Sequence, residues 1–176
     1  NNLCMEYEGS EVSYMAGVPY VGAVVKMSAG PGGNRGEFIA WDPTTGTKKW
    51  GIKEKWSSWS GALSTAGDVV FYGTMDGWFK AVDAKDGKEL WKFKTGSGII
   101  GAPMTYVGPD GKQYVAILSG IGGWSGLVVA GDLATDDPTA ALGAVGAFGE
   151  LGKDTNKGGM LYVFALDGAA KEMAKK

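Results

Sequence analysis

Apolar and polar residues alternate along this chain with the period of β-strands. Residues 77–84 and 88–95 alternate position by position, and residues 68–74 are rich in β-branched and aromatic side chains. Residues 112–120 form a continuous apolar run, as expected of a strand that is covered on both faces. Asp-Gly pairs lie between these stretches and favour hairpins, because Gly tolerates positive φ. The pattern therefore predicts an antiparallel unit that joins these four strands in chain order.

One eleven-residue phrase occurs twice. AWDPTTGTKKW (40–50) recurs as AVDAKDGKELW (81–91), which begins 41 residues later (81 − 40), and a third beginning, GGMLYVFALDG (158–168), lacks the final Trp. Repeats of about 40 residues with four antiparallel strands are typical of β-propeller blades. In such a blade the final Trp can wedge between its own sheet and the next sheet. The alternative is two unrelated hairpins, each with a Trp in the core.

The predicted fold is therefore all-β, with four-stranded antiparallel propeller blades. Residues 1–168 are expected to form blades, and residues 169–176 a Lys-rich tail that is helical or frayed. The repeat is irregular around residues 120–148, where Asp137 before Pro138 is expected to cap a short helix. A propeller ring closes with about 4–8 blades, so two complete blades with further pieces would leave sheet faces bare. We therefore expect the chain to be a C-terminal part of a longer polypeptide, or one product of a cleaved one.

Composition excludes several classes of function. The chain has 31 Gly among 176 residues, which suits short strands joined by tight turns. Its net charge is −2 without a basic stripe, so nucleic-acid binding is not expected, and no apolar run is long enough to span a membrane. The absence of His excludes Ser–His and Cys–His catalysis and His metal ligands. The single Cys, Cys4, is either a buried apolar filler or one half of a disulfide whose partner lies elsewhere.

Several short motifs do not carry their usual chemistry here. GSGIIG (96–101) satisfies the dinucleotide-binding pattern, but the residues after it enter a strand, so no helix start is available for a phosphate. DPTTG (42–46) and DAKDG (83–87) resemble calcium loops but lack the spaced acidic ligands, so we interpret them as hairpin turns. Asp136 and Asp137 are interpreted as part of a solvated loop rather than as an acid–base pair.

The repeated phrase and several longer stretches resemble a known family. The pattern Ala-x-Asp-x-x-(Thr/Asp)-Gly-x-x-x-Trp is similar to the tryptophan-docking motif of PQQ-dependent (quinoprotein) alcohol dehydrogenases, eight-bladed β-propellers that carry pyrroloquinoline quinone (PQQ). Within that family, the resemblance is strongest to the C-terminal third of the methanol dehydrogenase large subunit. The stretches that carry it are CMEYE (4–8), WSSWSGALSTAGDVVFYGTMDGWFKAVD (56–83), LWKFKTGSGIIGAPMTY (90–106), QYVAILSGIGGW (113–124) and DPTAALGAVGAF (137–148). The segments WSGALSTAG and LSGIGGW favour the lanthanide-dependent branch over the calcium-dependent one.

The resemblance implies roles for three residues. Trp59 would help to seat PQQ, and Trp124, which follows a Gly run and is expected on a loop or strand end, would line the same axial pocket. Cys4 would form a structural disulfide with a cysteine outside this chain. The alternative for Trp59 is a docking Trp packed between blades. The remaining tryptophans are assigned to packing: Trp41, Trp50, Trp56, Trp78 and Trp91.

The function that the resemblance implies is that of one part of a periplasmic PQQ-dependent alcohol dehydrogenase, with methanol as the favoured substrate. In that family a lanthanide or Ca²⁺ ion polarises the quinone, a carboxylate takes the alcohol proton, and hydride passes to the quinone. The resemblance places the catalytic and metal-binding residues outside this chain. It also implies three partners: the remaining propeller segment of the same enzyme, a c-type cytochrome as electron acceptor, and a second copy in a homodimer. The chain alone is expected to be inactive.

Two alternatives stay open at this point. A non-enzymatic periplasmic β-propeller scaffold would keep the docking phrase but bind proteins, and it would carry no quinone absorbance. A related quinoprotein for ethanol or another alcohol would keep the same blades, because the substrate-facing residues lie mostly outside this chain.

Overall fold

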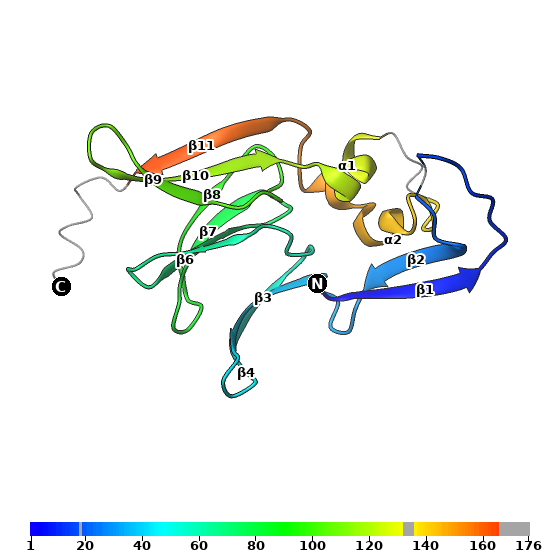
Figure 1. Cartoon of the computed structure of the whole chain (residues 1–176), viewed down its shortest axis with the longest axis horizontal. Helices are drawn as coiled ribbons and strands as arrows, with labels where there is room; N and C mark the ends of the chain where they lie inside the picture. The colour runs from blue at the N-terminus through cyan, green and yellow to red at the C-terminus, as the bar shows by residue number, and fades with distance from the viewer. Residues whose placement is uncertain (18, 132–135, 166–176) are drawn as a thin grey trace.

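The computed structural model describes residues 1–17, 19–131 and 136–165. Within these residues the strands form four separate antiparallel sheets (Figure 1). The strands are β1 (Leu3–Gly9), β2 (Ala23–Ala29), β3 (Gly36–Asp42), β4 (Thr47–Glu54), β5 (Ala62–Ser64), β6 (Val69–Gly73), β7 (Trp78–Asp83), β8 (Glu89–Lys94), β9 (Met104–Val107), β10 (Gln113–Gly120) and β11 (Gly159–Ala165). The helices are α1 (Gly123–Ala130), α2 (Ala144–Phe148) and the short 3-10 helix η1 (Leu151–Lys153).

The sheet β5–β6–β7–β8 is a complete four-stranded blade, so the predicted type of unit is confirmed. One of the four strands predicted for this blade was wrong. Residues 112–120 supply β10, which is the central strand of the sheet β11–β10–β9 and does not belong to this blade. The fourth strand is β5, which is only three residues long. The expected cover on both faces is only partial: Ala116 and Ile117 are buried, whereas Leu118 is 58 % exposed.

The two copies of the repeated phrase form the same hairpin turn. The backbone N–H of Gly46 donates to the carbonyl of Asp42, and the N–H of Gly87 donates to the carbonyl of Asp83, each at 2.9 Å. Both glycines have positive φ, 64° and 75°. Each Asp side chain also accepts a hydrogen bond from the backbone N–H two residues further on. The interpretation of residues 42–46 and 83–87 as hairpin turns is confirmed.

The final Trp of each copy contacts the next sheet. The indole Nε1 of Trp50 donates to the carbonyl of Ala84 at 2.9 Å. Its ring lies so close to Gly87 that a Cβ there would be 2.7 Å from a ring atom. Trp91 likewise meets Phe164 of β11 edge-to-face, with ring centroids 5.2 Å apart. The predicted wedge between sheets is therefore confirmed, and two unrelated hairpins would not account for the docking of one copy on the other.

A polar junction joins the β3–β4 sheet to the blade. Glu54 accepts hydrogen bonds from the Tyr72 hydroxyl and from Lys80 Nζ, both at 2.7 Å. The side chains of Lys80 and Glu54 are only 14 % and 11 % exposed. Phe38 stacks on Tyr72 with ring centroids 3.9 Å apart. Burial, and then the Glu54 carboxylate, raise the pKa of Tyr72 well above its ordinary value, so its hydroxyl remains a donor.

An aromatic junction joins the blade to the β9–β10–β11 sheet. Phe79, Ile99 and Ile117 are completely buried at its centre. Phe79 contacts Phe164 of β11 with ring centroids 5.6 Å apart. Further aromatic rings surround this centre: Phe71, Trp91, Phe93 and Tyr162. The β11 strand within the third phrase copy is thus confirmed as far as residue 165. The remainder of that copy and the predicted tail, 169–176, lie outside the described residues.

Residues 121–131 and 136–155 form a helical segment between β10 and β11. Figure 1 shows α1 and α2 between the β1–β2 sheet and the β9–β10–β11 sheet. Gly146 lies against β2 so closely that a Cβ there would be 2.4 Å from the carbonyl oxygen of Met27. Phe148 and Leu151 of this segment share a core cluster with Met27 and with Trp56. This packing fixes the segment between the sheets.

The predicted helix cap at Asp137 was wrong. The Asp137 carboxylate accepts hydrogen bonds from the backbone N–H and hydroxyl of Thr139, at 2.9 and 2.6 Å, and so holds a turn. The chain passes through further turns before α2 begins, and the residue before α2 is Gly143, with φ of 85°. In the described part of the chain, no helix has the length and apolarity needed to cross a membrane.

Candidate functional site

Trp59 lies in the connector between β4 and β5, residues 55–61. Its ring meets Phe148 of α2 edge-to-face, with centroids 5.2 Å apart, and packs against the core cluster of the helical segment. The side chain is half-buried, so part of the ring surface stays accessible. The ring is therefore fixed on one side and available on another.

The residues after Trp59 hold the connector rigidly. The backbone N–H of Gly73 donates to Ser60 Oγ at 3.0 Å, and Ser60 Oγ donates to the carbonyl of Gly101 at 2.9 Å. Gly61 has no room for a side chain, because a Cβ there would lie 2.6 Å from the Cβ of Ala102. The backbone at Gly61 therefore lies directly against another part of the chain.

Trp124 lies in the first turn of α1 and not on a loop, as the Gly run before it suggested. Its side chain is 37 % exposed, and its indole Nε1 donates to the carbonyl of Ala141 at 2.6 Å. Ala141 and Leu142 both have left-handed backbone conformations, with φ of 52° and 55°, which non-glycine residues rarely adopt. Because the only donor of the indole is already used, Trp124 can offer a ligand its ring but not its N–H.

The structure does not bring the two tryptophans into direct contact. No ring contact between the described residues joins Trp59 to Trp124. They are linked through the helical segment, because Phe148 contacts Trp59 while Ala141 accepts from Trp124, and both belong to or pack against one core cluster. The helical segment therefore positions both candidate residues.

One hollow among the described residues lies away from both tryptophans. It measures about 440 Å³, and its lining includes Ile100, Leu118 and Met160 but neither Trp59 nor Trp124. Ser119 is the one residue of this lining with a polar side chain, and no charged side chain lines it.

Residues 51–115 match the family model described as "Glucose/ethanol/alcohol dehydrogenase, beta-propeller domain", named PQQ. The lanthanide-dependent methanol dehydrogenase of Methylacidiphilum fumariolicum (strain SolV) is 57 % identical over 172 residues, which is 95 % of this chain and 28 % of that protein. The chain belongs to the family of PQQ-dependent alcohol dehydrogenases. It spans less than a third of the length of this relative.

Two further comparisons place the chain within the PQQ-dependent alcohol dehydrogenases. "Methanol dehydrogenase [cytochrome c] subunit 1" of Methylobacterium organophilum is 50 % identical over 174 residues, which cover 96 % of this chain and 27 % of that protein. A solved structure titled "Europium-containing methanol dehydrogenase" superposes with a TM-score of 0.89 at 57 % identity, covering 94 % of this chain and 30 % of that one. The predicted propeller fold is confirmed, and the higher identity to the lanthanide-dependent relative agrees with the branch that the sequence favoured.

Cys4, the third residue to which the family resemblance gave a role, lies in β1 opposite Ser28. It is exposed and unpaired, so the interpretation as a buried filler was wrong. Its disulfide with a cysteine outside this chain stays a prediction. Exposure on an edge of the two-stranded β1–β2 sheet leaves its sulfur accessible to such a partner.

The other tryptophans differ in how well they fill the packing role assigned to them. Trp56 is 2 % exposed, and Trp50 docks on the next hairpin as described above. Trp78 lies beneath the ammonium groups of Lys92 and Lys94, at 5.3 and 5.0 Å from its ring centroid. Trp41 is 56 % exposed, so its assignment to packing was wrong within this chain.

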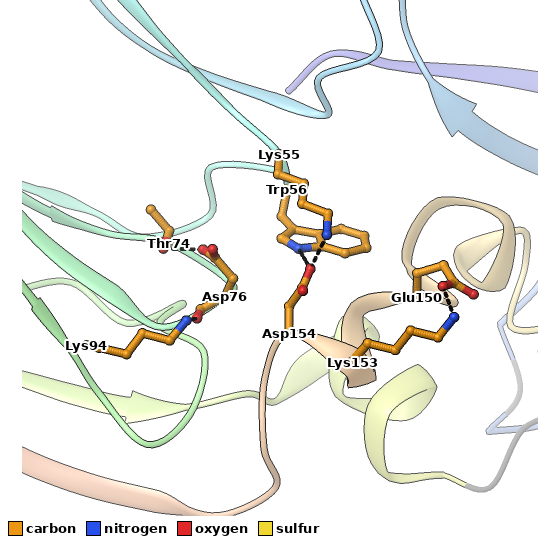
Figure 2. A network of polar contacts seen from close by, with 8 residues as sticks. All are labelled: Lys55, Trp56, Thr74, Asp76, Lys94, Glu150, Lys153 and Asp154. Atoms are coloured by element: carbon orange, nitrogen blue, oxygen red, sulfur yellow. Dashed lines mark hydrogen bonds and ion pairs between the residues drawn. The ribbon is translucent and has the colours of Figure 1, made fainter.

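Sequence reasoning missed a polar contact that reaches the connector. Asp154 Oδ2, just after η1, accepts hydrogen bonds from Trp56 Nε1 at 2.8 Å and from Lys55 Nζ at 2.5 Å. Figure 2 shows the indole nitrogen and the ammonium group both bonded to one oxygen of this carboxylate. Lys55 and then Trp56 hold the pKa of Asp154 below its ordinary value, although burial opposes them. No local pattern could reveal it, because 98 residues separate Asp154 from Trp56.

The remaining motif interpretations agree with the structure. β9 begins at Met104, so residues 96–101 lead into a strand, and a dinucleotide helix does not follow them. Asp137 is engaged in the turn with Thr139 and not in an acid–base pair. Among the described residues no group of three or more His, Cys, Asp and Glu side chains could hold a metal ion.

Proposed function

We propose that this chain forms one wall of the PQQ pocket in a lanthanide-dependent methanol dehydrogenase. The observation that carries the proposal is the superposition on a europium-containing methanol dehydrogenase with a TM-score of 0.89, together with two accessible tryptophans fixed by one helical segment. Trp59 and Trp124 are the residues that would contact the cofactor. The rest of the propeller would supply the substrate site and the metal ligands.

The side chains present fit a flat quinone. PQQ is a planar, conjugated ring system, and aromatic side chains stack favourably on such surfaces. Trp59 keeps part of its ring accessible while Phe148 fixes its edge, and Trp124 has its N–H already bonded to Ala141. Each ring would therefore offer an aromatic face to a planar ligand while one of its neighbours holds it in place.

The described residues do not fit the metal. A lanthanide or Ca²⁺ ion needs several oxygen ligands, and no acidic cluster of that kind is present in residues 1–17, 19–131 and 136–165. When bound, PQQ supplies the acceptor for the two electrons that leave the alcohol, with a metal ion as Lewis acid. This chain contributes binding and orientation of the ring, and none of its described groups takes the alcohol proton.

The proposal extends to the partners of the complete enzyme. Methanol is the proposed substrate and a c-type cytochrome the proposed electron acceptor, in agreement with the printed names of the relatives. We further propose a periplasmic location, a homodimer, and a disulfide between Cys4 and the remaining propeller segment. An exposed, unpaired Cys4 supports the last of these.

The proposal is tested by assembling the chain with the rest of its propeller, PQQ and a lanthanide salt. Methanol-dependent reduction of an artificial electron acceptor is then measured for the assembly and for the chain alone. Turnover by the assembly, and none by the chain alone, is expected. An assembly without turnover and without near-ultraviolet quinone absorbance would overturn the proposal and favour a non-enzymatic scaffold. Turnover by the chain alone would contradict the proposal that this chain supplies only part of the PQQ pocket.

A further inference from the structure

Asp154 makes the contact that ties the end of the helical segment to the β4–β5 connector. Its Oδ2 accepts from Trp56 Nε1 at 2.8 Å and from Lys55 Nζ at 2.5 Å. Both donors belong to the connector, and Asp154 lies 98 residues away from Trp56 in the chain. This bond therefore crosses between two parts of the chain that meet only through folding.

The indole held by Asp154 is buried and has neighbours on several sides. Trp56 is 2 % exposed, and the guanidinium of Arg35 lies 4.8 Å from its ring centroid. The Nε1–H is the only hydrogen-bonding group of an indole, so its acceptor favours one combination of χ1 and χ2 for the side chain. Asp154 is that acceptor. Rotation of the Trp56 ring would thus break its only hydrogen bond in a buried place, which is unfavourable.

Trp56 is linked to Trp59 through one shared ring. Phe148 lies 6.4 Å from Trp56 and 5.2 Å from Trp59, measured between ring centroids. Phe148 is 1 % exposed, so it cannot shift without displacing neighbours in a close-packed core. The order of contact is therefore Asp154, Trp56, Phe148 and Trp59.

We propose that Asp154 is a positioning residue for PQQ, acting through the indole of Trp56 and the ring of Phe148 on the plane of Trp59. The proposal rests on the proposed function, in which Trp59 seats the cofactor. Among the described residues no hydrogen bond or ring contact joins Asp154 to Trp59 or Trp124 directly. The effect of Asp154 is to hold Trp59 in the orientation that the flat ligand requires.

A neighbouring ion pair offers a matched control. Glu150 forms an ion pair with Lys153, and both residues precede Asp154 in the same helical segment. The side chain of Glu150 is 63 % exposed and that of Lys153 is 75 % exposed. Figure 2 shows this pair apart from the indole that Asp154 contacts. Glu150→Gln therefore removes a carboxylate of the same segment without removing a bond to the connector.

The first measurement is PQQ affinity in the complete propeller, followed by quinone absorbance. Asp154→Ala should weaken PQQ binding about tenfold, as expected for the loss of the net free energy of one ordinary hydrogen bond. Asp154→Asn should restore most of the affinity, because an amide oxygen still accepts from the indole. Glu150→Gln should match the wild type. In a Trp56→Phe background, Asp154→Ala should add little further loss, since the two residues act in one chain of contacts.

The second measurement does not require PQQ to bind. Fluorotryptophan is incorporated into the complete propeller, and the fluorine resonance of Trp59 is assigned with Trp59→Phe. Asp154→Ala should shift the Trp59 resonance, and Glu150→Gln should leave it unchanged. A Trp59 resonance that does not respond to Asp154→Ala, or additive effects of Asp154→Ala and Trp56→Phe on PQQ affinity, would overturn the inference. A wild type that binds no PQQ would instead refute the proposed function, while the fluorine shift would still test the coupling.

Discussion

The blade β5–β8 is held on its two sides by different chemistry. On the side of β3–β4, the polar junction adds directional contacts to one ring stack, Phe38 on Tyr72. These contacts are Trp50 on Ala84, and Tyr72 and Lys80 on Glu54. On the side of β9–β11, the aromatic junction consists of aromatic rings around a centre of completely buried side chains. The junction on one side of the blade therefore contains more directional hydrogen bonds, and the junction on the other side contains more buried aromatic rings.

The difference teaches which property each side contributes. A hydrogen bond to a single acceptor fixes the rotation and register of one sheet against another, because a small shift breaks it. Contacts among aromatic rings bury much apolar surface but tolerate small displacements. We infer that the polar junction determines how consecutive sheets are oriented, and the aromatic junction supplies more of the stabilising free energy.

The largest effect is expected at the centre of the aromatic junction. Phe79 is fully buried and contacts rings from both sheets. Phe79→Ala should lower the free energy of unfolding by about 4 kcal/mol, through lost burial and a cavity. Chemical denaturation measures this change. Phe79→Leu, which keeps most of the volume, should cost clearly less, and equal losses for both variants would argue against a packing role.

A smaller but still large effect is expected at the polar junction. Glu54→Ala should lower the free energy of unfolding by about 3 kcal/mol, because Lys80 and Tyr72 are left buried without their acceptor. The control is Glu37→Ala, which breaks an exposed pair with Lys48 and should cost at most about 1 kcal/mol. Similar losses for the two variants would remove the distinction between buried and exposed pairs.

The docking of Trp50 is tested by two glycines with nearly the same backbone conformation. Gly87 and Gly111 have φ of 75° and 74°, but only Gly87 has a ring against it, while nothing lies within 4 Å of a Cβ at Gly111. Gly87→Ala should therefore destabilise the fold by about 2 kcal/mol more than Gly111→Ala, because of overpacking against the indole. Denaturation midpoints at equal slope measure the difference. If the two substitutions cost the same, strain in the turn alone would explain both.

The smallest effect is confined to alkaline solution. The pKa of Tyr72 is raised in the folded chain above its ordinary value of 10.0, first by burial and then by Glu54. Its contribution to stability is present below pH 10.0 and is lost as pH rises above that value, because the unfolded state then releases the proton first. Tyr72→Phe should flatten this alkaline loss, as followed by thermal unfolding across pH. The exposed Tyr14→Phe is the control and should keep the wild-type profile.

Sequence alone predicted the hairpins and the docking of Trp50. In each hairpin the Asp side chain accepts a backbone hydrogen bond and the Gly adopts positive φ, and the Trp that follows packs on the next sheet. Sequence reasoning misassigned one strand, since Ala62–Ser64 is only three residues long and has no recognisable period. The apolar run that became β10 suits a central strand of either neighbouring sheet, and periodicity does not choose between them.

The candidate site was less predictable from the residues themselves. Trp59 and Trp124 were singled out only through a family resemblance, because a Trp on a Gly-rich stretch also suits packing. The start of α2 follows consecutive left-handed residues, two of them not glycine, which propensity does not indicate. The contact of Asp154 with Trp56 joins distant segments, so only the folded chain reveals it.

The most direct test of the central claim is the affinity of the complete propeller for PQQ when single tryptophans are removed. Trp59→Ala and Trp124→Ala should each weaken PQQ binding by about tenfold or more, whereas Trp41→Ala, at an exposed position, should leave the affinity unchanged. Equal affinities for all three variants and the wild type would contradict the assignment of a PQQ wall to this chain.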